Sequence, residues 1–402
     1  MAKKKKWLKL RHKILTAVLR VFVHPYTVLK YNIKVERFKE QGKRAYLVLF
    51  NHQTAYDQFF VSMAFRGPVY YVASEDIFSM GWLSSLIKYI VAPIPIKKQS
   101  TDVSAVLNCM RVAKEGGTIA MAPEGNRTFS GKTEYMNPAI VPLVKKLKLP
   151  LALYRIEGGY GVHPRWSDEI RKGKMRSFVS KVVEPEDYLK LSDEELFELI
   201  KNELFVDEAV ADGEFLSKNR AEYLERAIYV CPYCGLSEFE SNGAKMKCKK
   251  CELEIVYNEN KTISANEENF PFEFINDWYE YQNEFIKNTS LENYRENPIY
   301  CEKANLYKVN LYKNKELVFE NASLKLFENK ITFECENQTR EFLFEDVSVV
   351  SVLGKNKLNF YFGDEVYQIS ADKRFNALKY VHIFYKHKNV TRSDTNEQFL
   401  GI

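Results

Sequence analysis

A histidine and an aspartate stand five residues apart, directly after a short apolar run. The run 46–50 reads as a buried strand, and His52 and Asp57 follow it. A carboxylate that accepts a hydrogen bond from one imidazole nitrogen holds the ring in one tautomer, and it stabilises the imidazolium that forms when the other nitrogen takes a proton. The pair therefore predicts a general base, His52, oriented by Asp57. A second pair with this spacing, His163 and Asp168, lies in a glycine-rich stretch, and we expect it to be structural.

A second group of polar residues follows the apolar run 118–122. In chain order the group is Pro123, Glu124, Gly125, Asn126 and Arg127. A glycine at a strand end lets a phosphate approach the backbone, and an arginine binds a phosphate through two N–H groups. Glu124 would orient Arg127 or accept a hydrogen bond from a substrate hydroxyl. The alternative is an ordinary turn with a surface ion pair, which contributes little to stability.

Taken in order, these motifs resemble those of the lysophosphatidic acid acyltransferase (PlsC-like) family of glycerolipid acyltransferases. The resemblance covers about residues 30–210, and it rests on His52-x4-Asp57, the stretches 72–75 and 94–98, and Pro-Glu-Gly-x-Arg at 123–127. It implies a layered α/β domain in which His52 is the base and Asp57 orients it. It also implies a site for the acceptor and its phosphate, formed by Lys98, Glu124, Gly125, Asn126 and Arg127.

Several positions depart from the family pattern. Lys98 stands in place of an arginine, so the positive charge stays but the planar fork is lost. Asn126 replaces a threonine and Ala122 an aromatic residue, while Leu153 replaces a proline and Arg155 is unexpected. These differences leave the reaction type unchanged and bear on the identity of the acceptor.

The reaction implied by the resemblance is the transfer of a fatty acyl group to a glycerolipid hydroxyl. A thioester is already activated, so no covalent enzyme intermediate and no catalytic cofactor is needed. The expected acceptor is lysophosphatidic acid, which gives phosphatidic acid; glycerol 3-phosphate or another lysophospholipid is the alternative. The donor is acyl-CoA or acyl carrier protein.

Four of the seven cysteines form two close pairs, Cys231 with Cys234 and Cys248 with Cys251. Two C-x2-C pairs at this spacing supply four thiolates for a tetrahedral metal, most often zinc, with iron as the other option. The segment resembles a zinc ribbon with a structural metal, because four thiolates fill the coordination shell. Cys-Pro-Tyr-Cys also resembles a glutaredoxin active site, a reading that leaves the second pair unexplained.

The elements that position these residues fall into three segments along 402 residues, a length that suggests two or three domains. We expect an α/β, layered glycerolipid-acyltransferase domain followed by a small zinc ribbon and a C-terminal PH-like β-barrel. The predicted domains are 1–226, with the acyltransferase; 227–262, with the zinc ribbon; 263–299, a helical linker; and 300–392, a PH- or GRAM-like β domain. In the first, the expected strands are 46–50, 69–73, 118–122 and 151–156, and the expected helices 55–65, 82–90, 102–114, 139–147 and 192–208. In the last, the expected strands are 317–319, 324–327, 330–334, 341–344, 347–352, 358–362 and 366–369, before a helix at 374–387.

Residues 7–23 combine apolar residues at helical spacing with four basic ones, and we expect a helix that Pro25 ends. Such a helix lies in an anionic membrane interface or packs on its own domain. No apolar run is long enough to span a bilayer. Because the cysteines form a poor disulfide framework and the stretch 14–23 lacks a small-residue cleavage site, we expect a cytoplasmic protein, peripheral or monotopic on the inner face of the cell membrane.

Charge is distributed unevenly, although the whole chain carries only +6. Residues 1–181 hold 32 Lys and Arg against 12 Asp and Glu, whereas the remainder is acidic. We therefore expect residues 1–181 to bind a polyanionic partner, such as an anionic membrane surface or phosphorylated substrates. A nucleic-acid-binding zinc-ribbon protein is the alternative, but its ribbon and barrel would then fall in the acidic part.

Overall fold

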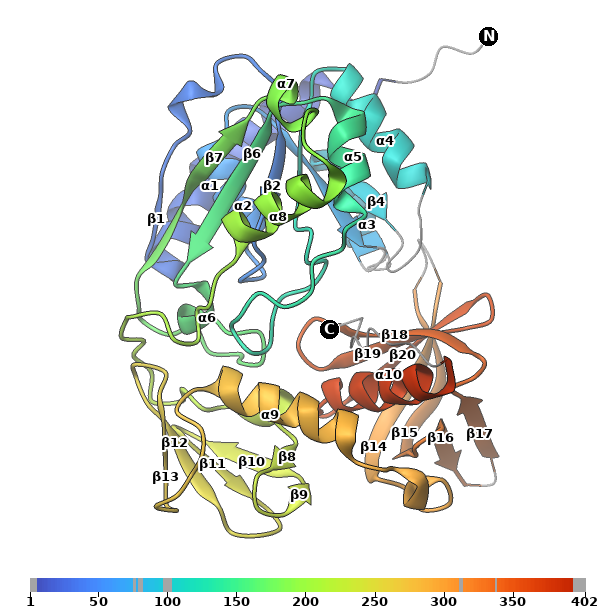
Figure 1. Ribbon diagram of the computed structural model, residues 1–402. Helices are drawn as coiled ribbons and strands as arrows, with labels where there is room; N and C mark the ends of the chain where they lie inside the picture. The colour runs from blue at the N-terminus through green and yellow to red at the C-terminus, as the bar shows by residue number, and fades with distance from the viewer. Residues whose placement is uncertain are drawn as a thin grey trace. The chain divides into compact units, whose positions relative to one another are not determined.

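The computed structural model describes residues 6–74, 77–78, 82–96, 103–310, 314–336 and 338–392. The chain forms two compact units. Unit 1 is Met1–Pro164 with Ile170–Phe215, and unit 2 is Arg165–Glu169 with Leu216–Ile402. Each unit has its own sheets, which are labelled in Figure 1.

Unit 1 is built on a seven-stranded sheet whose order is β1-β7-β6-β2-β5-β3-β4. Neighbouring strands are parallel except for β6 and β7. Because parallel neighbours share a direction, the chain leaves β2, β5 and β6 at the same edge of the sheet. The strands are β1 (Ile33–Val35), β2 (Leu47–Phe50), β3 (Val69–Ser74), β4 (Ile94–Ile96), β5 (Thr118–Met121), β6 (Leu151–Glu157) and β7 (Met175–Val183).

Helices cover both faces of this sheet, as the alternation of side chains along β2 illustrates. Leu47 and Leu49 pack in a core with α4, α5 and α8, while Val48 and Phe50 pack in a second core with α1 and α2. Figure 1 shows α8 in front of the sheet and α1 behind it. The helices are α1 (Leu10–Tyr31), α2 (Asp57–Ala64), α3 (Trp82–Ile90), α4 (Val103–Lys114), α5 (Ile140–Leu147), α6 (Gly159–Val162), α7 (Pro185–Tyr188), α8 (Asp193–Leu204) and the 3-10 turn η1 (Lys39–Gln41). This arrangement confirms the predicted layered α/β domain.

The prediction that Pro25 ends the first helix is wrong, because α1 continues through it to Tyr31. Proline has no N–H to donate to the carbonyl four residues earlier, which belongs to Val21. Both residues are exposed, so water reaches that carbonyl and the missing bond costs little. The helix ends instead at Asn32, whose φ of 48° is a left-handed conformation that asparagine tolerates.

Several polar side chains of α1 face the domain, and a row of its apolar side chains faces outward. Arg20 caps the end of α2 by donating to the carbonyls of Ser62, Phe65 and Gly67 at 2.9, 2.7 and 2.7 Å. His12 is buried, with Nδ1 3.2 Å from the Tyr70 hydroxyl. The apolar residues left outside are 51% to 84% exposed: Leu10, Ile14, Val18, Val21, Phe22, Tyr26 and Leu29. A helix that stabilised unit 1 by hydrophobic packing alone would be oriented the other way.

Unit 2 begins with small antiparallel elements around the paired cysteines. A four-stranded sheet has the order β10-β11-β12-β13, and β8 pairs with β9. Helix α9 is fastened to β8, because Trp278 donates to the Val230 carbonyl at 2.8 Å and Gln282 bonds Ala227 and Tyr229. The elements are η3 (Leu224–Arg226), β8 (Val230–Cys231), β9 (Gly235–Leu236), β10 (Phe239–Asn242), β11 (Lys245–Cys248), β12 (Glu254–Tyr257), β13 (Ile263–Ala265), α9 (Ile275–Asn288) and η4 (Glu292–Tyr294).

The last part of unit 2 is a curled antiparallel sheet in the order β17-β16-β15-β14-β20-β19-β18, with α10 beside β18. Two details of the prediction are wrong. The prediction placed no strand at 300–309, which is β14, and it split β15 into 317–319 and 324–327. Asn321 takes a φ of 46° within β15 and its N–H is bonded by Asn305, so the strand bends without ending. The elements are β14 (Tyr300–Val309), β15 (Glu316–Leu326), β16 (Lys330–Cys335), β17 (Gln338–Leu343), β18 (Val347–Leu353), β19 (Lys357–Phe362), β20 (Glu365–Ala371) and α10 (Leu378–Arg392).

Unit 2 also contains the short segment Arg165–Glu169, which the chain reaches between α6 and β7. Asp168 forms ion pairs with Arg226 at 2.9 Å and Lys355 at 3.0 Å. The histidine with the same spacing, His163, instead has its Nδ1 3.1 Å from the Tyr31 hydroxyl. Both residues of the second histidine–aspartate pair therefore have structural partners of their own.

Candidate functional site

The sharpest chemical feature of unit 1 lies between the end of β2 and the start of α2. Asp57 is the first residue of α2 and is 0% exposed, and its Oδ2 lies 2.8 Å from Nδ1 of His52. The His52 side chain is 26% exposed, so the imidazole reaches solvent while its partner does not. With Nδ1 bonded to the carboxylate, Nε2 is the nitrogen left to exchange a proton with a substrate.

The Asp57 carboxylate also holds the chain that carries His52. It accepts the Gln53 N–H at 2.7 Å, the Thr54 N–H at 2.9 Å and the Thr54 hydroxyl at 2.7 Å. Its position in the first turn of α2 adds the favourable interaction of an anion with a helix N-terminus. One carboxylate thus fixes both the imidazole and the loop from which it projects.

The residues that follow β5 lie next to this pair because β5 neighbours β2 in the sheet. Glu124 Oε1 lies 2.8 Å from the backbone nitrogen of His52. Desolvation raises the pKa of Glu124 to about 8, and the nearby carboxylates of Asp57 and Glu134 act in the same direction. Gly125 has a φ of 73°, a conformation that disfavours any residue with a Cβ, although no atom would obstruct one.

Arg127 and Asn126 complete this loop. Arg127 is only 9% exposed, and burial lowers the pKa of its guanidinium, while the charge of Asp57 acts in the opposite direction. Asn126 is half-buried. Lys98, the other residue expected at the acceptor site, lies outside the described residues. The structure therefore brings Glu124, Gly125, Asn126 and Arg127 to the edge of the sheet where His52 lies.

Asn51 and Arg155 lie near the same edge of the sheet. Asn51, which the sequence analysis missed, is buried and bonds the carbonyl and the N–H of Ile156 at 2.8 and 2.7 Å. A polar residue at the end of the apolar run 46–50 was the signal that could have identified it. Arg155 alternates with Tyr154 and Ile156 along β6, so it faces the side of α4, α5 and α8. His52 lies against Phe50, which faces the opposite side, with ring centroids 6.1 Å apart.

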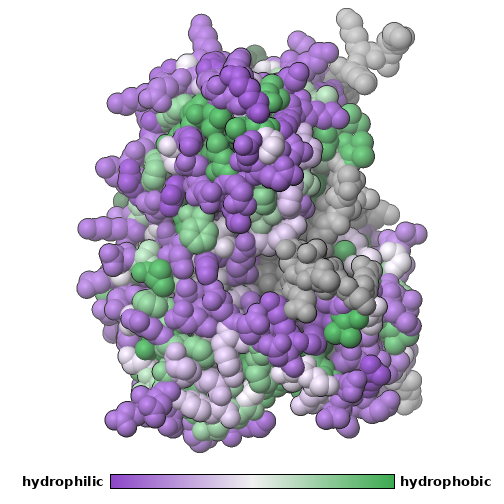
Figure 2. All heavy atoms as spheres, in the orientation of Figure 1, coloured by the Kyte–Doolittle hydropathy of each residue, from purple (hydrophilic) through white to green (hydrophobic). Residues whose placement is uncertain are grey.

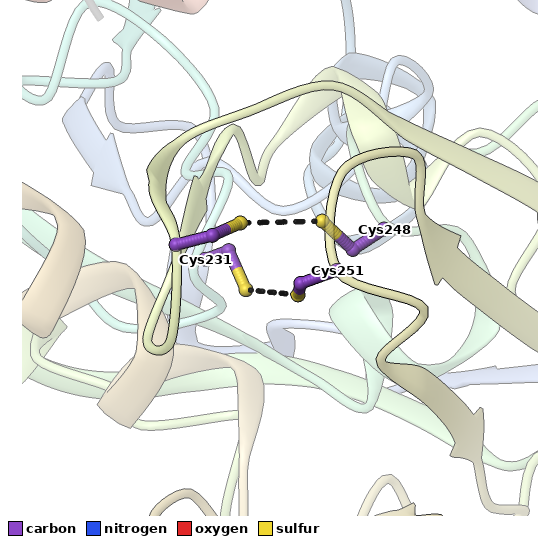
Figure 3. A group of neighbouring side chains, drawn as sticks. Cys231, Cys248 and Cys251 are labelled. Carbon is purple, nitrogen blue, oxygen red and sulfur yellow. Dashed lines mark hydrogen bonds between the residues drawn. The ribbon is translucent and has the colours of Figure 1, made fainter.

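The four paired cysteines of unit 2 converge on one point. Their sulfur atoms all lie within 4.8 Å of one another, and the separations are 3.5 Å for Cys231–Cys251 and 3.6 Å for Cys234–Cys248. Figure 3 shows Cys231, Cys248 and Cys251 pointing toward one another from two loops. Thiolates about 2.3 Å from a zinc ion lie about 3.8 Å apart in a regular tetrahedron, so this cluster fits such an ion. Ser237 Oγ lies 3.0 Å from the Cys248 sulfur and adds an outer hydrogen bond of the kind that orients a metal ligand.

The part of the chain that contains the first of these sites is similar to known proteins. Residues 30–153 match the family model described as Acyltransferase. A curated relative, the 1-acyl-sn-glycerol-3-phosphate acyltransferase of Bacillus subtilis (strain 168), is 24% identical over 128 residues, which are 32% of this chain and 60% of the relative. The crystal structure of the 1-acyl-sn-glycerophosphate (LPA) acyltransferase PlsC from Thermotoga maritima is 22% identical, with a TM-score of 0.41 over 48% of this chain and 78% of that chain. The matched range contains His52, Asp57 and the loop 123–127, so the first site lies within the part of the chain that is similar to the acyltransferase family.

Proposed function

We propose that the protein transfers a fatty acyl group from an acyl thioester to the free hydroxyl of lysophosphatidic acid at a membrane surface, giving phosphatidic acid. The observation that carries the proposal is the hydrogen bond of 2.8 Å between His52 and the buried Asp57, within an acyltransferase-family domain. The name of the Bacillus subtilis relative supports lysophosphatidic acid as the acceptor. The donor is acyl-CoA or acyl carrier protein.

The proposed mechanism uses His52 as a general base. Nε2 takes the proton of the acceptor hydroxyl as its oxygen attacks the thioester carbonyl, and Asp57 stabilises the imidazolium through Nδ1. The tetrahedral intermediate collapses by breaking the carbon–sulfur bond. The imidazolium then returns the proton to the departing thiolate, so the products are the ester and a free thiol, and His52 is neutral again.

The loop 123–127 supplies the proposed phosphate contacts. The exposed backbone at Gly125 lets a phosphate approach, and Asn126 is a neutral donor beside it. We assign Arg127 and Lys98 the positive charge that a phosphorylated acceptor requires. The excess of basic residues in 1–181 adds attraction for the same anionic groups.

Membrane docking is proposed for the outward face of α1. Its exposed apolar residues form a continuous helical stripe, and basic residues such as Lys9, Lys13 and Lys30 belong to the same helix or its start. Helix α3 adds the exposed Trp82, Leu86 and Tyr89, and the Arg11 guanidinium lies 4.0 Å from the Tyr89 ring centre. None of the helices in the described ranges has the length and apolar content that a bilayer-spanning helix needs. The face drawn in Figure 2 is mainly hydrophilic, with a hydrophobic cluster near α7 and α8, and α1 lies behind it.

We infer that the four cysteines hold a structural zinc ion and that residues 227–262 form a zinc ribbon. The short antiparallel strands β8 to β12 and the distances among the sulfur atoms support this inference. Four thiolates leave no open position for substrate, so the ion would stabilise the fold of this segment. For residues 300–392 we propose a PH- or GRAM-like domain, which the curled seven-stranded sheet and α10 support.

The reaction is tested by measuring thiol release from acyl-CoA by the full chain on liposomes. Separate reactions contain lysophosphatidic acid, glycerol 3-phosphate or a neutral lysophospholipid. We expect release that depends on lysophosphatidic acid, is abolished in His52→Ala and persists in His387→Ala, a control histidine of unit 2. Release that is independent of His52 would contradict the mechanism, and a preference for another acceptor would reassign the substrate.

Membrane docking has its own test, which does not require activity. Phe22→Glu combined with Leu29→Glu places two charges in the outward stripe of α1, and we expect it to abolish flotation with anionic liposomes. Leu317→Glu is the control, because Leu317 is also an exposed apolar residue but lies in β15. Equal flotation of all three proteins would refute docking through α1.

A further inference from the structure

The loop that carries His52 has left the sheet and needs other bonds to fix it. On one side, the Asn51 amide continues the pairing with β6 through both backbone groups of Ile156. On the other side, the ladder between β2 and β5 ends at Leu49 and Met121. The next backbone N–H toward β5, that of His52, therefore needs an acceptor that β5 itself does not supply.

Glu124 supplies that acceptor. Its Oε1 lies 2.8 Å from the His52 nitrogen, where a carbonyl of β5 would lie if the ladder continued. The His52 backbone is thereby held on the β5 side, as Asn51 is on the β6 side and Gln53 and Thr54 are by Asp57. The loop is fixed from three directions, and the Glu124 bond is the one made at the histidine's own main chain.

The charges around Glu124 do not suit a direct contact with a phosphate. The charged groups that raise the pKa of Glu124 are the carboxylates of Asp57 and Glu134. Burial raises the pKa of Glu124 to about 8 and so favours its neutral form, while the hydrogen bond from the His52 N–H acts in the opposite direction. A neutral carboxyl group still accepts a hydrogen bond through Oε1, and it adds no negative charge beside the histidine.

We propose that Glu124 is a positioning residue, which fixes the main chain of His52 and through it the imidazole, for the acyl transfer proposed above. It acts through His52 and not as a contact to the acceptor's phosphate. Its effect should then appear in the rate of the chemical step and not in the affinity for the acceptor. Any side chain that places a hydrogen-bond acceptor oxygen here, charged or neutral, should be enough to hold the His52 main chain.

Two substitutions at Glu124 separate these properties. Glu124→Gln keeps an acceptor oxygen, and we expect kcat within about threefold of the wild type. Glu124→Met keeps the side-chain length without an acceptor, and the lost hydrogen bond should lower kcat by about 10- to 100-fold with the acceptor KM unchanged. Glu134→Gln removes a neighbouring negative charge without touching His52, and we expect it to behave as the wild type. Its own carboxylate accepts from Ser130 at 2.6 Å.

The amide of His52 provides a readout that does not depend on activity. Its proton should exchange slowly in the wild type and in Glu124→Gln, and much faster in Glu124→Met, as measured by nuclear magnetic resonance. Equal exchange in all three proteins, or a Gln variant as impaired as the Met variant, would overturn the proposal. So would a raised acceptor KM with normal kcat in Glu124→Met. If the wild type transfers no acyl group, the proposed reaction fails, while the exchange rates still decide whether Glu124 fixes His52.

Discussion

Replacing Asp57 by asparagine should abolish most activity while leaving the protein folded. The carboxylate of Asp57 faces donors on both oxygens: His52 Nδ1 and Gln53 N at Oδ2, and the Thr54 N–H and hydroxyl at Oδ1. An asparagine has one acceptor oxygen and one NH2 group. Whichever way the amide lies, its NH2 group meets a backbone N–H, and in one orientation it also forces the imidazole into the tautomer with the proton on Nε2. That tautomer cannot accept a proton from the substrate.

The magnitude follows from these contacts. Loss of the correct tautomer and of the charge that stabilises the imidazolium should lower kcat by about 1,000- to 10,000-fold, or about 4 to 5.5 kcal/mol of activation free energy. One buried N–H without an acceptor should cost about 1–3 kcal/mol of unfolding free energy. The fold should survive, because unit 1 is stabilised mainly by two apolar cores.

The assay is thiol release with lysophosphatidic acid, together with urea unfolding of the same preparations. Thr54→Val is the matched control, because it removes the hydroxyl donor to Asp57 but keeps the carboxylate, and we expect less than about a tenfold loss of kcat. An Asp57→Asn variant that keeps kcat within that range would refute the assignment of His52 as a base oriented by Asp57.

Three further predictions concern unit 2. Arg226→Met should lower the unfolding free energy by about 3 kcal/mol, which is the lower end for a broken buried ion pair because Asp168 is 44% exposed. Urea unfolding measures this loss, and an unchanged midpoint would contradict the prediction. Burial raises the pKa of Asp168, but the hydrogen bonds from Arg226 and Lys355 outweigh it and lower that pKa to about 2. The contribution of ionised Asp168 to the unfolding free energy is therefore complete above about pH 3.9, the pKa of aspartate in the unfolded chain, and is lost as the pH falls through about 2. Between pH 4 and pH 2 the wild type should lose more stability than Asp168→Asn, and parallel curves would show that the pair contributes nothing. One zinc ion per chain is expected by metal analysis, with a lower melting temperature after chelation or in Cys248→Ser; a preparation free of metal with an unchanged melting temperature would exclude the zinc site.

Features that depend on local spacing can be predicted from the sequence alone. The strands 118–122 and 151–156 and the helices 82–90 and 139–147 follow from periodicity, and the structure has them within one or two residues. The pairing of His52 with Asp57 is equally local, because one turn between β2 and α2 brings the two side chains together. The two C-x2-C pairs are local in the same way, although the contacts between the pairs, Cys231 with Cys251 and Cys234 with Cys248, join residues 20 and 14 positions apart.

Features in which a residue's partner is remote in sequence depend on contacts between elements. Only the neighbouring positions of β2 and β5 bring Glu124 to the main chain of His52, across 72 residues. The helix α1 continues through Pro25, and its Arg20 bonds the end of α2 while a row of apolar side chains is left outside. In unit 2, Arg226 is buried against a segment 60 residues away, at Trp166. Periodicity reports which side chains share a face of one element, but the free energy that selects these arrangements comes from contacts between elements, which spacing along the chain does not encode.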